Sequence, residues 1–184
     1  MRILVGFYSE TGNTEKVAKA IFEEVSKQHE TDVKKVDQIM PNIMNDYDVV
    51  FLGSACHSTD LANPVKKILA ALPSSPRFKL AGFFTHSTYT AEGNERQHKL
   101  FRRWASNCIT SFQEISEEKK IDFMGYFNCQ GAPSPPIKEF INREIVTSPD
   151  EWKEYIKEVI KHPTPEDLQK AREFAKEIMK KVNE

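Results

Sequence analysis

Five segments with strand character alternate with helical stretches along most of the chain. They are predicted at residues 3–8, 32–36, 49–53, 80–85 and 121–127. Most are largely apolar, as in strands buried on both faces, whereas 32–36 is only half apolar and suits a sheet edge. Strands that alternate with helices in this way predict a parallel α/β sheet with helices on both faces.

The predicted helices between these strands are marked by apolar residues that recur every three to four positions. The first helix has an apolar stripe formed by Val17, Ile21 and Val25. Pro73 ends the second helix, whose stripe is formed by Val65, Ile68, Leu69 and Leu72. The third is predicted as one continuous helix, with a stripe formed by Phe101, Trp104, Ala105, Cys108, Ile109 and Phe112.

The chain continues beyond the fifth predicted strand, where a minimal fold of this type needs only one closing helix. A proline-rich turn is predicted at 133–136, and Ser148-Pro149 and Thr164-Pro165 each combine a helix cap with a first-turn proline. The helix after Ser148 is expected to bury Trp152, Tyr155, Ile156, Val159 and Ile160. The helix after Thr164 is expected to bury Leu168, Ala171, Ala175, Ile178 and Val182.

These elements predict a single domain over residues 1–184. Its sheet core is expected at 1–132, and the additional C-terminal helices at 133–184 are expected to pack on that core. Three roles are open for the additional helices. They would cover a binding site, form a homodimer interface or simply complete the scaffold.

Composition and charge narrow the classes of partner. With 39% hydrophobic and 29% charged residues, the chain has the composition of a soluble globular protein. Its formal net charge of −1 gives no reason to expect nucleic acid or an anionic membrane as a partner. No apolar run approaches the roughly 18 residues of a membrane span, so neither a span nor a signal peptide is expected and a cytoplasmic location is predicted. Reduced thiols are predicted for Cys56, Cys108 and Cys129, which lack Cys-x-x-Cys spacing.

The hexapeptide Ser-Glu-Thr-Gly-Asn-Thr at residues 9–14 lies between the first strand and the first helix. The first N–H groups of a helix have no partners within it, and the helix dipole is positive at that end, so both suit a phosphate. Ser, Thr, Asn and Gly are also simply common at helix N-termini, but four hydrogen-bonding side chains around a glycine favour an anion site. The segment is neither a Walker loop nor a dinucleotide fingerprint.

The pattern Ser9-x-Thr11-Gly12-Asn13-Thr14 after an N-terminal strand resembles the FMN-phosphate loop of the flavodoxins. This resemblance implies a flavodoxin-like three-layer sandwich, in which a five-stranded parallel sheet has the order 2-1-3-4-5. Ligands of such sheets bind at the carboxyl ends of the strands, where the strand order reverses. FMN is therefore the expected cofactor, and its phosphate is expected to be bound by Ser9, Thr11, Gly12, Asn13 and Thr14, with Glu10 of the same loop also counted among the cofactor-binding residues.

Two further loops are expected to converge on the same crevice and surround the flavin ring. The loop after the third strand would contribute Ala55, Cys56, His57 and Ser58, and the loop after the fourth would contribute Thr85, His86, Ser87, Thr88 and Tyr89. His57 and Tyr89 have flat side chains that can stack on a planar ring. The ordinary alternatives are a packed tyrosine and a solvated or capping histidine.

The leading hypothesis is an FMN-binding electron-transfer protein that passes one or two electrons to a redox partner protein or a small-molecule acceptor. The first alternative is an FMN-dependent NAD(P)H:quinone-type oxidoreductase. It is motivated by the weak net charge and by a basic cluster of Arg96, Lys99, Arg102 and Arg103. The second alternative is a scaffold that binds no flavin and instead binds a partner or a metal ion. In the metal-binding version, the ligands would be Cys56, His57, His86 and Cys129. No catalytic side chain and no metal site are predicted.

Overall fold

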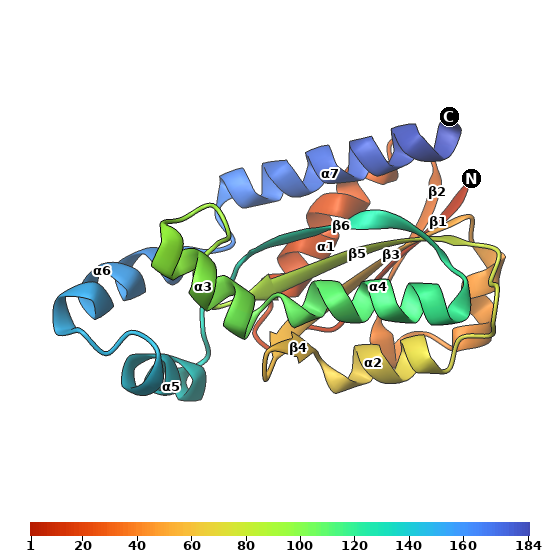
Figure 1. Cartoon of the computed structure of the whole chain (residues 1–184). Coiled ribbons are helices and arrows are strands. Elements are labelled where there is room, and N and C mark those ends of the chain that lie inside the picture. Colours follow the sequence, from red (N-terminus) through yellow and green to blue (C-terminus); the bar gives the residue numbers. More distant parts are fainter.

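The computed structural model describes residues 1–184 and contains one central sheet (Figure 1). Its long strands, all parallel, have the order β2-β1-β3-β5-β6. Their bounds are β1 (Arg2–Phe7), β2 (Glu30–Lys35), β3 (Val49–His57), β5 (Lys79–His86) and β6 (Asp122–Gln130). A two-residue strand, β4 (Asp60–Leu61), pairs antiparallel with the end of β3. Counting the long strands alone, this is the predicted order 2-1-3-4-5, and β2 lies at a sheet edge as expected.

Helices cover both faces of the sheet (Figure 1). α1 (Asn13–Val25) and α7 (Pro165–Asn183) pack on one face, whereas α2 (Asn63–Ala70) and α4 (Asn107–Lys119) pack on the other. Two short 3-10 helices, η1 (Val36–Gln38) and η2 (Pro41–Asp46), connect β2 to β3. No helix has the length and apolar character that crossing a membrane requires. Each face of the sheet has its own hydrophobic core beneath these helices.

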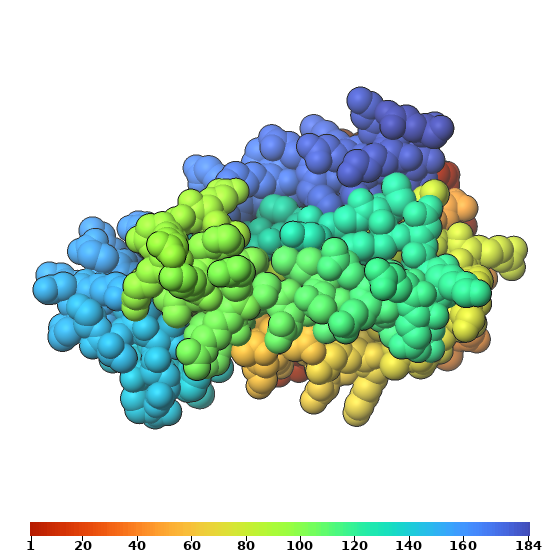
Figure 2. Space-filling view, in the orientation of Figure 1, coloured from red at the N-terminus to blue at the C-terminus, as the bar shows by residue number.

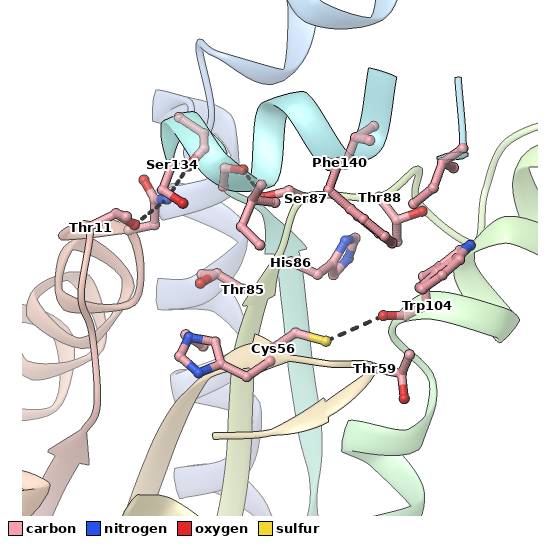
Figure 3. Close-up of a pocket in the computed structure, with 18 of the residues that line it drawn as sticks. Thr11, Cys56, Thr59, Thr85, His86, Ser87, Thr88, Trp104, Ser134 and Phe140 are labelled. Atoms are coloured by element: carbon pink, nitrogen blue, oxygen red, sulfur yellow. Dashed lines mark hydrogen bonds between the residues drawn. The ribbon is translucent and has the colours of Figure 1, made fainter. Parts of the chain in front are cut away.

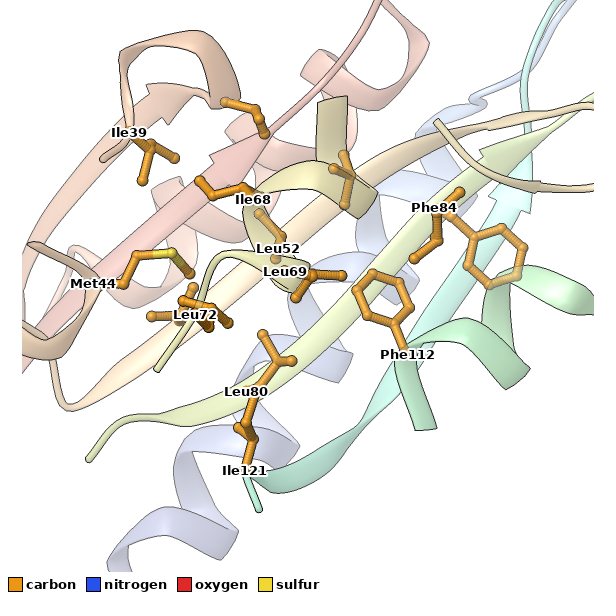
Figure 4. Packing of buried hydrophobic residues seen from close by; sticks show 14 of the residues in the cluster. Ile39, Met44, Leu52, Ile68, Leu69, Leu72, Leu80, Phe84, Phe112 and Ile121 are labelled. Carbon is orange, nitrogen blue, oxygen red and sulfur yellow. The ribbon is translucent and has the colours of Figure 1, made fainter. Parts of the chain in front are cut away.

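The core beneath α2 and α4 shows how the predicted apolar stripes are used (Figure 4). Ile68, Leu69 and Leu72 pack against strand residues such as Leu52 and Leu80. On the opposite face, the core contains the α1 stripe of Val17, Ile21 and Val25 together with Ala171, Ala175 and Ile178 of α7. The central strands alternate their side chains between these two cores and are therefore buried on both faces.

The single helix predicted across residues 101–112 is wrong. The structure has two helices there, α3 (Glu95–Trp104) and α4, separated at Ala105 and Ser106. Ala105 leaves helical geometry at φ −141°, and the Ser106 hydroxyl donates to the Arg102 carbonyl at 2.6 Å. The Trp104 carbonyl accepts a hydrogen bond from Cys56 Sγ at 3.4 Å, so it is held by β3. The break redirects α3 beyond the sheet while α4 stays packed on it (Figure 1).

Two strands extend further than the apolar pattern indicated. Residues 54–57 were expected in a loop, but they continue β3 because Ser54 and Ala55 pair with β5, and Cys56 and His57 pair with β4. Likewise, residues 128–130 continue β6 by pairing with the end of β5. Backbone pairing with a neighbouring strand, which the local sequence does not reveal, carries both strands past their apolar runs.

The additional C-terminal segment contains three helices. Besides α7 and the predicted α6 (Pro149–Val159), it contains α5 (Pro135–Glu144), which starts inside the proline-rich segment predicted as a turn. Prolines occupy the first positions of α5, where their missing N–H groups cost nothing. Ile141, Val146, Tyr155 and Val159 form a small separate core between α5 and α6. Ile160, predicted to be inward, is 56% exposed.

α5 and α6 lie at the carboxyl end of the sheet beside α3. They form a lobe that projects beyond the helices packed on the sheet (Figures 1 and 2). Arg96 of α3 forms an ion pair with Glu151 of α6, and the Trp104 ring packs edge-on against Phe140 of α5 at 5.5 Å between centroids. We call residues 135–159 the helical cap, because they stand over the strand ends.

Candidate functional site

A pocket of about 750 Å³ lies where the carboxyl ends of β1, β3 and β5 meet the helical cap (Figure 3). Its position is the point at which the strand order reverses, between β1 and β3. The structure brings most of the candidate residues to it. Those lining the pocket are Glu10, Thr11, Asn13, Ala55, Cys56, His57, Ser58, Thr85, His86, Ser87, Thr88 and Tyr89. Ser9, Gly12 and Thr14 belong to the same loop but do not line the pocket wall.

The loop at residues 9–14 ends at an uncapped helix N-terminus. Gly12 occupies the N-cap position of α1 with φ +84°, a conformation that glycine adopts without strain, and no side chain caps the helix. The Ser9 hydroxyl is buried and has no hydrogen-bond partner. Buried hydroxyls without partners are uncommon, and the free N–H groups of a helix N-terminus attract anions. The residues present therefore fit a phosphate group.

Two polar side chains of this loop hold it in place. The Thr14 hydroxyl lies 2.8 Å from that of Thr85 on β5, and Asn13 Nδ2 donates to the Ala132 carbonyl at 2.8 Å. Gly131 permits this approach, because a Cβ there would lie 2.8 Å from Asn13 Nδ2. Both side chains are buried and shape the loop. The pocket-lining residues Gly131 and Ala132 were not predicted as part of the site.

The end of β3 forms a tight hairpin with β4 instead of the expected open loop. Its two turn residues, Ser58 and Thr59, have φ +48° and +78°. Two-residue hairpin turns favour positive φ at both positions, which usually requires Asn or Gly. His57 comes just before the turn, and its Nε2 atom is 3.5 Å from Glu10 Oε2. Glu10 also accepts a hydrogen bond from the Tyr8 hydroxyl at 2.6 Å. The turn and the loop at residues 9–14 thus contact each other through Glu10.

The strain in this turn can be tested directly. Replacing Thr59 with glycine is expected to raise the free energy of unfolding by about 1 kcal/mol, since relief of positive-φ strain exceeds the added flexibility of the unfolded chain. Thr59→Ala keeps the strain and loses the contact between the Thr59 hydroxyl and Asn107, so it should not stabilise the protein. Denaturant unfolding of the two variants measures the difference in their free energies of unfolding. If Thr59→Gly and Thr59→Ala are equally stable, the backbone at Thr59 is not strained.

The end of β5 contributes two buried polar groups to the pocket. His86 Nε2 lies 3.2 Å from Asn128 Oδ1, whereas Nδ1 has no partner. Burial lowers the pKa of His86 to about 4 despite the opposing effect of the Asn128 hydrogen bond, so the ring is neutral at pH 7. The hydroxyl of Thr88, a residue that is 7% exposed, is also buried without a partner. Ser87 is held by its hydroxyl, which donates to the Gly131 carbonyl at 2.9 Å.

Tyr89 is held by the helical cap. Its ring packs edge-on against Tyr155 of α6 at 5.3 Å between centroids, and its hydroxyl donates to Glu151 at 2.9 Å. Burial, followed by the hydrogen bond to Glu151, raises the pKa of Tyr89 to about 12. Tyr155 in turn donates to the Ser87 carbonyl. The expected ring-stacking tyrosine therefore connects the β5 loop to α6, with one side of it lining the pocket.

The largest group of lining residues that sequence reasoning missed comes from α3 and the cap. It consists of Trp104, Pro136, Ile137, Phe140, Ile141, Ile145, Val146 and Tyr155. Ile137, Phe140 and Ile141 have the i, i+3, i+4 spacing of a helical stripe, which is a signal that the neighbouring prolines obscured. The cap therefore covers the pocket, which is the first of the three roles considered for the additional helices.

The basic cluster predicted near the ring loop does not face the pocket. Arg96 pairs with Glu151, Lys99 pairs with Glu95, and the Arg103 guanidinium lies over the Trp104 ring, 5.2 Å from its centroid. Neither these residues nor any other Lys or Arg lines the pocket. Cys129 is 4% exposed and packs in the core beneath α1 and α7, where burial raises the pKa of its thiol. No three His, Cys, Asp or Glu side chains are arranged to hold a metal ion.

Comparisons with known proteins agree with this architecture. Residues 4–176 match the flavodoxin domain family. The flavodoxin-like domain-containing protein BilS of Clostridioides difficile is 27% identical and aligns with all of this chain and 99% of its own. The uncharacterized protein MJ0298 of Methanocaldococcus jannaschii is 26% identical, with 91% of each chain covered.

Among solved structures, oxidised flavodoxin 1 of Bacillus cereus superimposes with a TM-score of 0.64 at 16% identity, covering 98% of both chains. The archaeal flavodoxin structure gives 0.63 at 16% identity and covers both chains completely. The chain belongs to the flavodoxin family.

Proposed function

We propose that the protein is an FMN-binding electron-transfer protein. The phosphate of FMN would be held by loop 9–14 at the N-terminus of α1. The ring would lie toward residues 55–58 and 85–89, between the end of β3 and the helical cap. The observation that carries this proposal is the buried, unpartnered Ser9 hydroxyl beside an uncapped helix N-terminus, in a loop whose other residues line one end of a pocket of about 750 Å³.

The chain's own residues would bind, orient and shield the cofactor. When bound, FMN would supply the capacity to accept and release one or two electrons. Asn13 and Thr14 keep the phosphate loop against β5 and the end of β6. Phe140 and Ile141 of the cap, together with Trp104, form an apolar wall that would exclude water from the ring. His86, neutral at physiological pH, adds no positive charge beside it.

An electron carrier is a better match to this pocket than an NAD(P)H oxidoreductase. A dinucleotide carries phosphates that are usually bound by arginine or lysine, and no such side chain lines the pocket. The physiological partner would be a redox protein or a small-molecule acceptor. A cytoplasmic location and a homodimer both stay predictions from the sequence.

The phosphate site is tested by replacing Ser9 with alanine. FMN affinity is expected to fall about tenfold, because a hydrogen bond to a charged group is lost. Riboflavin, which lacks the phosphate, should bind both proteins equally. Stability should not fall, since the Ser9 hydroxyl makes no hydrogen bond in the protein itself. Flavin fluorescence titration of the flavin-free protein provides the affinities, with Ser26→Ala at the exposed far end of α1 as the matched control.

Two outcomes would contradict the proposal. A wild-type protein that takes up no FMN would leave the pocket without its proposed cofactor. Equal losses of FMN and riboflavin affinity in Ser9→Ala would place the phosphate away from this loop. Wild-type protein that binds FMN and titrates reversibly with dithionite under anaerobic conditions is the expected result.

A further inference from the structure

Two of the three thiols are neighbours behind the wall of the pocket. Cys56, near the end of β3, is partly exposed and lines the pocket. Its Sγ donates to the Trp104 carbonyl at 3.4 Å (Figure 3). Cys108 lies at the start of α4, just beyond the break that follows Trp104, and is completely buried in the core against which Cys56 packs. Only the fold brings these two cysteines together, because they are far apart in the sequence.

Further contacts join the same two segments on either side of the thiol pair. The Asn107 side chain donates to the Thr59 hydroxyl at 3.3 Å, and the Ser111 hydroxyl donates to Asp60 Oδ1 at 2.6 Å. Thr59 and Asp60 belong to the hairpin that follows β3, whereas Asn107 and Ser111 belong to the first turns of α4. These hydrogen bonds fix the hairpin on α4, so the two thiols are held beside each other.

The two thiols differ in what can reach them. Contact with the Cys56 thiol is the largest cause that raises the pKa of the Cys108 thiol, followed by burial. Cys108 is therefore protonated at neutral pH, and no solute reaches it directly. Cys56 opens on the pocket, where a small solute can contact its sulfur. An accessible cysteine beside a second, resolving cysteine is the arrangement that oxidants convert to a disulfide.

Cys129 provides an internal comparison within the same chain. It is 4% exposed and packs in the core on the opposite face of the sheet. Burial and the charge of Asp167 raise the pKa of its thiol, and no other thiol contributes. Cys129 therefore has neither the access to a solute nor the neighbouring sulfur that the other two cysteines have.

We propose that Cys56 and Cys108 form a redox-active pair, which a hydroperoxide entering the pocket converts to a disulfide. The Cys56 sulfur attacks the peroxide O–O bond and becomes a sulfenic acid, while its proton leaves with the departing hydroxide as water. The Cys108 sulfur then displaces the sulfenic hydroxyl, which leaves with the Cys108 proton as a second water. One S–S bond forms, the two thiols are oxidised by two electrons, and hydrogen peroxide is reduced to water. The inference does not depend on the proposed flavin function.

The test is treatment of the reduced, full-length protein with hydrogen peroxide, which is then removed with catalase. The remaining thiols are labelled with N-ethylmaleimide in denaturant and counted by intact mass. Of the three cysteines, only Cys129 is expected to be labelled after oxidation, and dithiothreitol should restore labelling of all three. Tryptic digestion without reductant should join peptide 36–66, which contains Cys56, to peptide 104–119, which contains Cys108.

Three variants assign the roles of the thiols. Cys108→Ala removes the resolving thiol, so the sulfenic acid at Cys56 should persist and be trapped by dimedone about tenfold more than in the wild type. Cys56→Ala should leave Cys108 reduced, because peroxide does not reach a buried thiol. Cys129→Ala is the matched control, in which the disulfide should form as in the wild type.

Each contrary result overturns the proposal. One is a wild-type protein that keeps all of its thiols in peroxide that fully oxidises glutathione. Another is a disulfide that contains Cys129 or that links two chains. Equal dimedone labelling of the wild type and Cys108→Ala would also overturn it, because Cys108 would then not resolve the sulfenic acid. FMN uptake is measured in separate samples, so failure of the flavin proposal would be a distinct result.

Discussion

The free energy of unfolding is expected to fall by about 3 kcal/mol as the pH is lowered from about 6.5 to about 4. The cause is His86, whose pKa is held near 4 in the folded protein by burial and lies near the ordinary value of about 6.5 in the unfolded chain. A difference of this size corresponds to about 3 kcal/mol. Over that pH interval the unfolded chain binds a proton at His86 that the folded protein does not, so acidification favours unfolding.

The loss of stability is complete only below the folded pKa of His86, and the pH dependence is confined to the interval between the two pKa values. Above about pH 6.5 the histidine is neutral in both states and contributes no pH dependence, and below about pH 4 it is protonated in both states. Carboxylates also titrate in this range, so the contribution of His86 is measured as a difference from His86→Gln. The variant keeps a hydrogen-bonding group near Asn128 and lacks the titration. Urea unfolding of both proteins at several pH values should show that the free energy of unfolding falls more steeply with decreasing pH in the wild type. If the two proteins lose stability in parallel, His86 is not the cause.

Gly53→Ala is expected to lower the free energy of unfolding by about 3 kcal/mol. Gly53 lies in β3, and a Cβ there would be 2.2 Å from ring carbons of Phe83 on the neighbouring strand β5. The Phe83 ring is completely buried and belongs to the core beneath α1 and α7. Protein interiors are close-packed, and overpacking such a site typically costs about 1–3 kcal/mol. Because the added Cβ would overlap the Phe83 ring so strongly, we expect a loss of stability at the upper end of this range.

A double-mutant cycle tests whether the overlap is the cause. Phe83→Leu alone should destabilise the protein by leaving a cavity, but it should also make room for the alanine methyl group. The loss of stability in the double variant Gly53→Ala/Phe83→Leu is therefore expected to be smaller than the sum of the losses in the two single variants, by about 1 kcal/mol or more. Denaturant unfolding of all four proteins gives the coupling. Strictly additive effects would show that the cost of Gly53→Ala does not arise at the Phe83 ring.

The strands of the sheet and the helices of its two covering layers could be predicted from the sequence, because the positions of these elements and their buried faces depend on local hydrophobic periodicity. The α1 stripe of Val17, Ile21 and Val25 is buried as expected, and α7 begins at Pro165 with Thr164 as its cap. The alternation of strands and helices predicted a parallel sheet, and the strand order came from the resemblance of residues 9–14 to the flavodoxin loop; the structure confirms that order. The segments that line the pocket were found for the same reason, since loops at the carboxyl ends of neighbouring strands converge.

The turn at Ser58 and Thr59 shows where local signals fail. Residues 54–60 contain no glycine or asparagine, so nothing in the sequence indicates a two-residue hairpin. The structure forms one nonetheless, because pairing between Cys56 and Leu61 and between His57 and Asp60 offsets the strain. The break between α3 and α4 is similar. The apolar stripe continues across it, while tertiary contacts such as the one between Cys56 and the Trp104 carbonyl redirect the chain.

What the sequence by itself determined is the layered α/β architecture, because that depends on periodicity along the chain, and the resemblance of residues 9–14 to the flavodoxin loop supplied the strand order that the structure confirms. The phosphate-binding role of residues 9–14 stays a prediction. Only the tertiary structure decided that α5 and α6 cover the pocket, that Tyr89 pairs with Tyr155 and Glu151, and that the basic residues of α3 face away from it. These features depend on contacts between residues far apart in the chain. Their free energies arise from burial and hydrogen bonding in three dimensions, which no local pattern encodes.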